Sequence, residues 1–323
     1  MRHVNDWRPS ASLELIRLRA SALAQIRAWF ASHGALEVET PVLSAAAVTD
    51  VNLNSLTTRV SKGKYFLHTS PEYSMKRLLA AGSGDIYQIC RVFRNGEIGR
   101  RHNPEFTMVE WYRLDWGVHQ LMDEIESLLS RMASGRRELS AARRLSYRAL
   151  CLEFAHLDPF DCTSAEICAC LERASVPIPA GLDEDFEALL DLLLASVIEP
   201  ALPADTPVFV FDFPASQAAL ARIRDDRPPV AERFELFLGG MELANGFHEL
   251  ADPAEQSRRF TQDLKRREAA GLPCPPVDQH LLAALEAGLP DCSGVALGFD
   301  RLVMWLAGCD DIAQVMSFDF GRA

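Results

Sequence analysis

The segments IYQICRVFRN (86–95) and HNPEFTMVEWY (102–112) decide the interpretation of this sequence. Both segments read as β-strands, in which alternate residues share a face: Ile86, Gln88, Cys90, Val92 and Arg94 lie on one side of the first strand, and Tyr87, Ile89, Arg91 and Phe93 on the other. The polar connection between them is too long for a tight turn. We therefore expect a hairpin with Arg94 at the end of its first strand, and a mobile loop that carries Arg100, Arg101 and His102. Because a guanidinium group offers a planar fork of donors, the hairpin is a candidate phosphate-binding element. The alternative is a solvent-facing hairpin with ordinary surface arginines.

Composition and charge restrict the class of protein. The 323 residues, 48% of them hydrophobic, suffice for one large domain or two modest ones. No apolar run reaches the roughly 18 residues that would span a bilayer, and the N-terminus lacks a signal-peptide core, so we expect a cytoplasmic location. The eight cysteines do not have zinc-site spacing and are expected to be free thiols. A net charge of −12 argues against a long nucleic acid as the main partner.

Hydrophobic periodicity predicts further elements. Residues 13–33 should form an amphipathic helix that stops at Gly34. Residues 35–43 should form a strand at an edge or an interface, because Pro41 cannot donate to a sheet ladder. We also expect a short helix over 75–79 and a strand over 209–213, and we interpret 115–205 as helical elaboration without assigned chemistry.

A second candidate site lies in MELANGFHEL (241–250). A regular strand places Asn245, Phe247 and Glu249 on one face and Glu242 on the other. If both glutamates serve one site, the pleat must break between them, and we expect a bulge at Gly246 or its neighbour. The alternative is two exposed strand acids.

A third candidate site lies in DCSGVALGFDRLVM (291–304). The pattern predicts a strand, a joint at Gly298 and a helix. A glycine at the joint permits close approach of a ligand to the backbone. Arg301 falls in the first turn of the helix, where a cation is unfavourable unless it faces an anion such as phosphate.

Together these segments resemble class II aminoacyl-tRNA synthetases, and most closely lysyl-tRNA synthetases. Phe93-Arg94-Asn95 with His102-Asn103-Pro104-Glu105-Phe106-Thr107 resembles motif 2, segment 35–43 resembles the dimer-forming motif 1, and segment 291–304 resembles motif 3. Ser70-Pro71-Glu72 resembles an Ala-Pro-Glu sequence whose acid helps to hold the amino acid. Alternatively, Glu72 is only a favourable charge at a helix start.

The resemblance implies an α/β (α+β) fold, that of a class II catalytic domain, with a mostly antiparallel sheet flanked by helices. We expect a single catalytic domain over residues 1–323 and a homodimer. The motif 1 helix starts near residue 13, so no N-terminal anticodon-binding barrel is expected. A class II core of this kind resembles the bacterial elongation factor P (R)-β-lysine ligase family, which transfers (R)-β-lysine to a lysine of that factor.

The resemblance also implies roles for individual residues. Arg94 and Arg301 would be the catalytic cations on the phosphates of ATP, and Glu242 and Glu249 would hold Mg²⁺. Further contacts to ATP would come from Asn95, Gly96, His102, Asn103, Leu243 and Gly298. The pocket for a substrate with two ammonium groups would combine Ser70, Glu72, Tyr112, Asn245, Phe247, Glu249 and Ala296.

Three positions depart from the synthetase pattern. Ser70 stands for alanine and Ala296 for glycine, and the added bulk near the amino-acid pocket fits an isomer with a displaced amino group. Gly96 stands where a glutamate usually follows Arg-Asn, so the acid could have moved to Glu97. The predicted function is therefore ATP-dependent β-lysylation of elongation factor P. The alternatives are a truncated lysyl-tRNA synthetase that charges tRNA and a non-catalytic regulator that binds lysine or adenylate.

Overall fold

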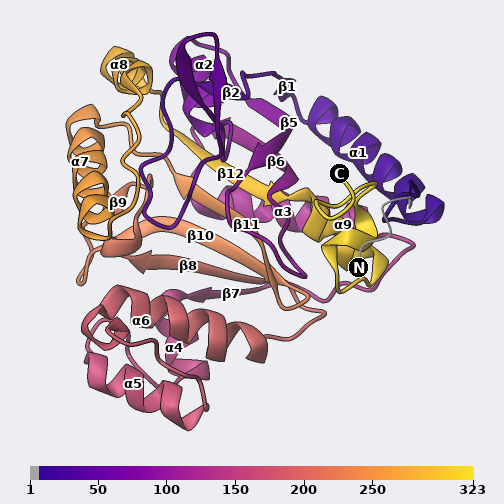
Figure 1. Ribbon diagram of the computed structural model, residues 1–323. Helices are drawn as coiled ribbons and strands as arrows, with labels where there is room; N and C mark the ends of the chain where they lie inside the picture. The colour runs from indigo at the N-terminus through magenta and orange to yellow at the C-terminus, as the bar shows by residue number, and fades with distance from the viewer. Residues whose placement is uncertain (1–6) are drawn as a thin grey trace. The chain divides into compact units, whose positions relative to one another are not determined.

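The computed structural model describes residues 7–323, which form two compact units (Figure 1). Unit 1 contains the chain up to Asp115, Arg131–Arg136 and Ala251–Ala323, and unit 2 contains Trp116–Ser130 and Arg137–Leu250. The assignment of the whole chain to one catalytic domain stays a prediction. Within the described residues, no helix combines the length and the apolar character that a membrane span needs.

The fold is mixed α/β, with mostly antiparallel strands. The helices are α1 (Leu13–Ser32), α2 (Glu72–Ala80), α3 (Val118–Ala133), α4 (Tyr147–Phe154), α5 (Ser164–Arg173), α6 (Phe186–Leu193), α7 (Pro253–Ala269), α8 (Gln279–Gly288) and α9 (Phe299–Ala307). The strands are β1 (Leu36–Glu37), β2 (Leu43–Ser44), β3 (Thr57–Val60), β4 (Gly63–Leu67), β5 (Ile86–Phe93), β6 (Glu105–Leu114), β7 (Arg143–Ser146), β8 (Val208–Pro214), β9 (Ile223–Arg224), β10 (Val230–Leu238), β11 (Met241–His248) and β12 (Cys292–Gly298).

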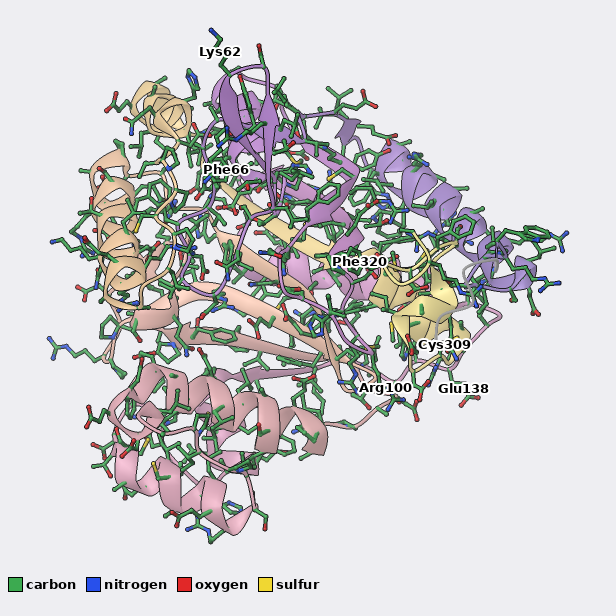
Figure 2. The ribbon with its side chains drawn as sticks, in the orientation of Figure 1. Lys62, Phe66, Arg100, Glu138, Cys309 and Phe320 are labelled. Atoms are coloured by element: carbon green, nitrogen blue, oxygen red, sulfur yellow. The ribbon has the colours of Figure 1, made fainter. Side chains whose placement is uncertain are left out.

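The predicted hairpin is confirmed as β5 and β6, which form the centre of unit 1. The two strands are antiparallel, with Ile86 opposite Tyr112 and Phe93 opposite Glu105. β12 continues the sheet on the other side of β6, and β1 lies parallel to β5 at the edge. β2, β4 and β3 form a separate three-stranded sheet, and the turn between β3 and β4 carries Lys62 (Figure 2).

Helices α1 and α9 cover one face of the β5–β6–β12 sheet. Phe30 of α1 stacks on Tyr87 with 4.4 Å between the ring centroids and lies 5.2 Å from the ring of Trp111. Burial of large aromatic side chains supplies much of the stability of such a layer. Since Tyr87 and Trp111 point to this face, the residues that alternate with them on β5 and β6 point to the opposite one.

The helix predicted over 13–33 is confirmed, whereas the single strand predicted over 35–43 is wrong. The Ser12 hydroxyl caps α1 by accepting from the backbone N–H of Leu15, and Gly34 follows the helix with φ of 75°. β1 and β2 then belong to different sheets, with Pro41 in the gap between them. A proline cannot donate to a ladder, so the chain leaves one sheet before it joins the next.

Unit 2 combines a sheet with a helical cluster. β8 and β11 pair antiparallel to β10, and β7 pairs parallel to β8. Helices α4, α5 and α6 share a buried apolar core with β8, in which Leu150, Ile167 and Leu189 are fully buried. The interpretation of 115–205 as helical missed β7, whose four residues are too few to show a period.

The break expected in 241–250 exists, but its predicted place was wrong. Asn245 lies opposite Glu235, and Glu242 lies opposite Phe237, so the extra residue of the bulge is Leu243 and not Gly246. Since Glu235 and Phe237 share a face of β10, the bulge places Glu242 on the same face as Asn245 and Phe247.

Candidate active site

One face of unit 1 carries polar side chains of β5 and β6 beside small residues of β12. Glu110 of β6 lies opposite Gln88 of β5 and opposite Ala296 of β12. Two positions further along β6, Tyr112 lies opposite Gly294. This is the face away from α1 and α9. The hairpin thus places these polar side chains on a regular sheet, which holds their positions tightly.

Glu110 is a buried acid, only 2% exposed, on this face. It accepts hydrogen bonds from Ser70 Oγ at 2.9 Å and from Tyr112 OH at 2.8 Å. Burial, and next to it the charge of Glu110, raises the pKa of the nearby Cys90 thiol to about 12. A buried carboxylate with two hydroxyl donors makes this part of the face suited to a cationic group.

Glu72 begins α2 beside the same network. Its backbone N–H donates to Ser70 Oγ at 2.9 Å, so the Ser70 hydroxyl links the backbone of Glu72 to the carboxylate of Glu110. The ammonium group of Lys76, one turn later, donates to Glu72 Oε1 at 2.7 Å and is almost completely buried. The structure therefore brings together Ser70, Glu72 and Tyr112 around Glu110, with Ala296 in register beside it.

Arg94 continues the chain beyond the end of β5. Its guanidinium carbon lies 5.1 Å from the centre of the Phe106 ring. Its Nε atom is buried and finds no acceptor among the described residues. A buried donor without an acceptor is costly, so this atom suits an anionic ligand.

The backbone conformation after Asn95 favours a glycine. Gly96 has φ of 87°, which a side chain would disfavour. The next residue, Glu97, places Oε1 3.8 Å from Arg94 Nη1. An acid therefore does lie beside Arg94, one position later than the synthetase pattern has it.

Arg301 lies in the first turn of α9 and contacts the hairpin loop. Its Nη2 lies 2.8 Å from His102 Nε2, and its Nε donates to the backbone carbonyl of Arg101 at 3.3 Å. The loop is also attached through Arg100, which forms an ion pair with Asp310 and whose carbonyl accepts from the N–H of Ile312 (Figure 2). The structure thus joins two predicted nucleotide ligands, Arg301 and His102.

Asn103 also has a structural role. Its Oδ1 accepts from the N–H of Phe320 at 2.9 Å, and its Nδ2 donates to the carbonyl of Glu105 at 2.6 Å. The side chain is buried and ties the C-terminal segment to the start of β6. Gly298, the last residue of β12, lies opposite Met108 and directly before α9.

The predicted residues of β11 lie in unit 2, among acids and one arginine. Glu235 of β10 is buried and forms an ion pair with Arg233, which also donates to Asn245 Oδ1 at 3.2 Å. Burial raises the pKa of Glu235 to about 7, with Arg233 opposing and Glu242 adding to the rise. The interaction with Glu242 and the shared strand face make these two carboxylates a candidate pair for a cation.

The remaining predicted residues of β11 lie in different surroundings. Glu249 is buried and forms an isolated bridge with Ala221. Leu243, the bulge residue, is buried. Phe247 packs against the helical core of unit 2. The prediction that these residues meet Arg94 and Arg301 around one nucleotide stays a prediction.

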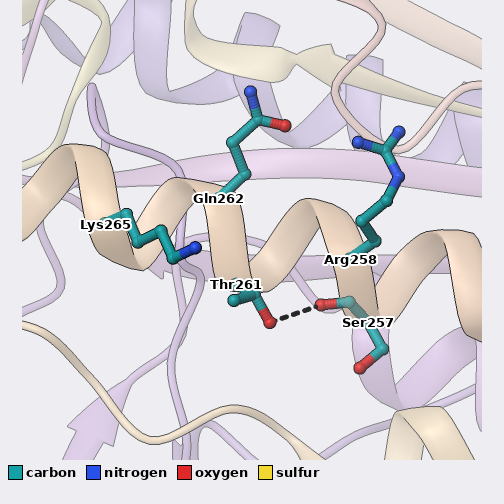
Figure 3. A pocket seen from close by; sticks show the side chains of 5 residues that line it. All are labelled: Ser257, Arg258, Thr261, Gln262 and Lys265. Atoms are coloured by element: carbon teal, nitrogen blue, oxygen red, sulfur yellow. Dashed lines mark hydrogen bonds between the residues drawn. The ribbon is translucent and has the colours of Figure 1, made fainter.

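No group of three or more His, Cys, Asp and Glu side chains within residues 7–323 could hold a metal ion by itself. An open hollow on the outer side of α7 carries none of the predicted residues. It is lined by Ser257, Arg258, Thr261, Gln262 and Lys265 (Figure 3).

Comparison with known proteins places the whole chain in one family. The model of the class II tRNA synthetases (D, K and N) matches residues 1–320. The chain belongs to the class II tRNA synthetase family. Among curated proteins, it is 47% identical to the elongation factor P (R)-β-lysine ligase of Salmonella typhi over the full length of both chains. It is equally similar, again over both full lengths, to the ligase of the same name from Salmonella gallinarum.

Some residues of the candidate site were not predicted from the sequence. Glu110, Lys76 and Glu235 were not singled out. The i, i+4 spacing of Glu72 and Lys76 could have indicated their ion pair. The pairing of Glu235 with the bulged strand could not have been found, since it depends on register.

Proposed function

We propose that this class II synthetase relative is an ATP-dependent ligase that activates (R)-β-lysine and transfers it to a lysine of elongation factor P. The observation that carries the proposal is the polar face of the β5–β6–β12 sheet. Arg94, with its buried Nε, lies on Phe106 at one end, and the acid Glu110 lies roughly 14 Å further along the same strand. One face thus offers an anion site and a cation site. The names of the full-length relatives supply the substrate.

The proposed reaction has two steps. A carboxylate oxygen of β-lysine attacks the α-phosphorus of ATP, and the bond to pyrophosphate breaks. The amine of the acceptor lysine then attacks the acyl carbon, AMP leaves, and a proton is released. Both steps depend on the positioning of the reactants, and neither needs a covalent intermediate with the enzyme.

In the first step, negative charge develops on phosphate oxygens. Arg94 would contact the α-phosphate and the attacking carboxylate, and Arg301 would contact the γ-phosphate. Asn95, Gly96, His102, Asn103, Leu243 and Gly298 would line the nucleotide. Glu97 is added to this set because it lies beside Arg94.

Membership in the family implies ATP and a divalent metal ion. We propose Mg²⁺, which binds carboxylates together with phosphate oxygens and would neutralise charge between them. Glu242 and Glu249 would hold it, and the buried Glu235 joins the candidates because it interacts with Glu242.

The substrate pocket would use the cluster around Glu110. Glu72, Glu110 and Glu249 would face the two ammonium groups of β-lysine, with Tyr112, Asn245 and Phe247 around its chain. Ser70 and Ala296 would narrow the pocket. Ser70 also joins Glu72 to Glu110 through its hydroxyl, which an alanine lacks.

The proposal includes a homodimer in the cytoplasm and no stable binding of nucleic acid. The net charge of −12 supports the last point. The eight cysteines form no disulfide, which fits a reducing compartment.

Pyrophosphate exchange with (R)-β-lysine and with α-lysine tests the proposal. We expect faster exchange with (R)-β-lysine. The variant Glu110→Gln should raise KM for β-lysine by about 10-fold or more, because hydrogen bonds to a charged group are worth about 1.5–3 kcal/mol. Glu105→Gln, on the exposed end of the same strand, should leave KM unchanged. Exchange that is faster with α-lysine, or equal KM values for both variants, would contradict the proposal.

A further inference from the structure

Arg267 of α7 is a buried arginine outside the site described above. It is 3% exposed and shares the buried stripe of α7 with Gln256 and Phe260. The opposite side of the helix carries the exposed hollow of Figure 3. A guanidinium group is rarely buried unless its donors are satisfied, so this position demands a reason.

The guanidinium group binds a distant segment of the chain. Its Nη1 donates to the carbonyl of Asp50 at 2.6 Å and to that of Leu53 at 3.1 Å, and its Nη2 donates to the side-chain oxygen of Asn54 at 3.0 Å. Its Nε donates to the carbonyl of Pro273 at 2.7 Å. One side chain thus fixes segment 50–54 against α7 from more than 200 positions away in the sequence.

Segment 50–54 in turn holds the backbone beside Arg94. The carbonyl of Asn54 accepts from the N–H of Asn95 at 2.7 Å, while the N–H of Arg94 donates to the carbonyl of Pro104 at 2.9 Å. These two bonds fix successive peptide groups where β5 ends. Asn54 therefore contacts Arg267 with its side chain and Asn95 with its carbonyl.

We propose that Arg267 is a positioning residue for the nucleotide site, which acts on Arg94 through segment 50–54. The inference rests on the proposed binding of ATP by Arg94 and Asn95. Arg267 touches neither ATP nor the amino acid. It sets the backbone from which Arg94 reaches the α-phosphate, and a displacement of about 1 Å at a reacting centre can cost about 100-fold in rate.

The test is steady-state pyrophosphate exchange with the full-length chain and (R)-β-lysine. Arg267→Met should lower kcat/KM for ATP by about 10- to 100-fold and raise KM for β-lysine by much less, because the Glu110 cluster still binds the ammonium groups of that substrate. Arg267→Lys should not restore activity, because an ammonium group cannot reproduce a fork that spans four acceptors. The matched control is Arg266→Met, an exposed arginine at the preceding position of α7, which should behave as wild type.

A double-mutant cycle separates positioning from loss of fold. Asn54→Ala removes the acceptor of Arg267 Nη2 and keeps the carbonyl that binds Asn95, so it should cause a smaller loss. Its effect should nearly vanish in the Arg267→Met background. If Arg267→Met does not fold, Asn54→Ala alone decides the question, since it must lower kcat/KM for ATP by more than it raises KM for β-lysine.

Two results would overturn the role of Arg267. One is a lowered Tm with unchanged kinetic constants for the folded protein. The other is an equal rise of both KM values in Arg267→Met and Asn54→Ala. Absence of exchange in the wild-type protein would instead overturn the proposed function, so the two failures are distinguishable.

Discussion

Arg94 combines a buried Nε without an acceptor and a ring contact with Phe106, so its guanidinium shape should matter as much as its charge. Arg94→Lys keeps the charge and removes the fork. We expect pyrophosphate exchange to fall by about 100- to 1000-fold, with little change in Tm. Arg91→Lys, at an exposed position of β5, serves as the control and should retain activity. Equal rates for the two variants would contradict the role of Arg94.

The raised pKa of Glu235 makes the stability of the fold depend on pH in a defined direction. Its pKa is raised from 4.5 to about 7, so the folded state binds this proton more tightly than the unfolded state. The resulting stabilisation is complete below pH 4.5 and is lost as the pH rises through 7. In Glu235→Gln this loss is absent. Between pH 4.5 and 8, the free energy of unfolding of the variant should therefore gain about 1–3 kcal/mol relative to wild type.

Urea unfolding in the presence of a chelator measures this difference. The control variant is Glu172→Gln, an exposed position on α5, whose stability should follow that of the wild type at each pH. A constant difference between Glu235→Gln and wild type across this range would show that Glu235 is not held in its protonated form.

At the scale of elements, the bulge in β11 determines which face of the sheet carries Glu242. Insertion of an alanine between Leu236 and Phe237 would give Leu243 a partner on β10, restore regular pairing and turn Glu242 to the other face. We expect loss of exchange activity at any Mg²⁺ concentration, while far-UV circular dichroism still reports the sheet. Leu243→Ala keeps the bulge and should retain measurable activity with lowered stability. Activity in the insertion variant would contradict the need for this register.

The sequence predicted the elements whose partners are close along the chain. The hairpin of β5 and β6 followed from alternation, and α1 followed from its period and its glycine stop. The bulge at Leu243 did not, because only pairing with β10 determines which residue is extra. The split of 35–43 into β1 and β2 depends on two different sheets, which no local pattern reveals.

The same reason explains what was predicted of the site. Arg94, Arg301 and Glu72 lie in motifs that resemble a known family. The hydrogen bonds of Ser70 with Glu110 and of Arg267 with Asn54 join residues far apart in the sequence. Such contacts depend on tertiary structure and leave no spacing to recognise.

At the scale of the whole molecule, the segment that resembles motif 1 exposes apolar side chains. Leu36, Val42 and Leu43 are 57%, 37% and 41% exposed. Exposed apolar side chains of this kind suit an interface between copies of the chain. We expect sedimentation at micromolar concentration to show a dimer, and Leu43→Glu to shift it towards monomer. The control Val60→Glu, at an exposed position of β3, should stay dimeric, and a wild-type monomer would contradict the proposal.

We propose that this class II synthetase relative modifies a protein and not a tRNA. Intact-mass analysis of elongation factor P, after incubation with the chain, ATP and each lysine isomer in turn, tests it most directly. We predict that the factor gains the mass of one lysyl group, that (R)-β-lysine is the best donor, and that Arg94→Lys abolishes the gain. An unchanged factor, together with efficient charging of lysine tRNA, would contradict the claim.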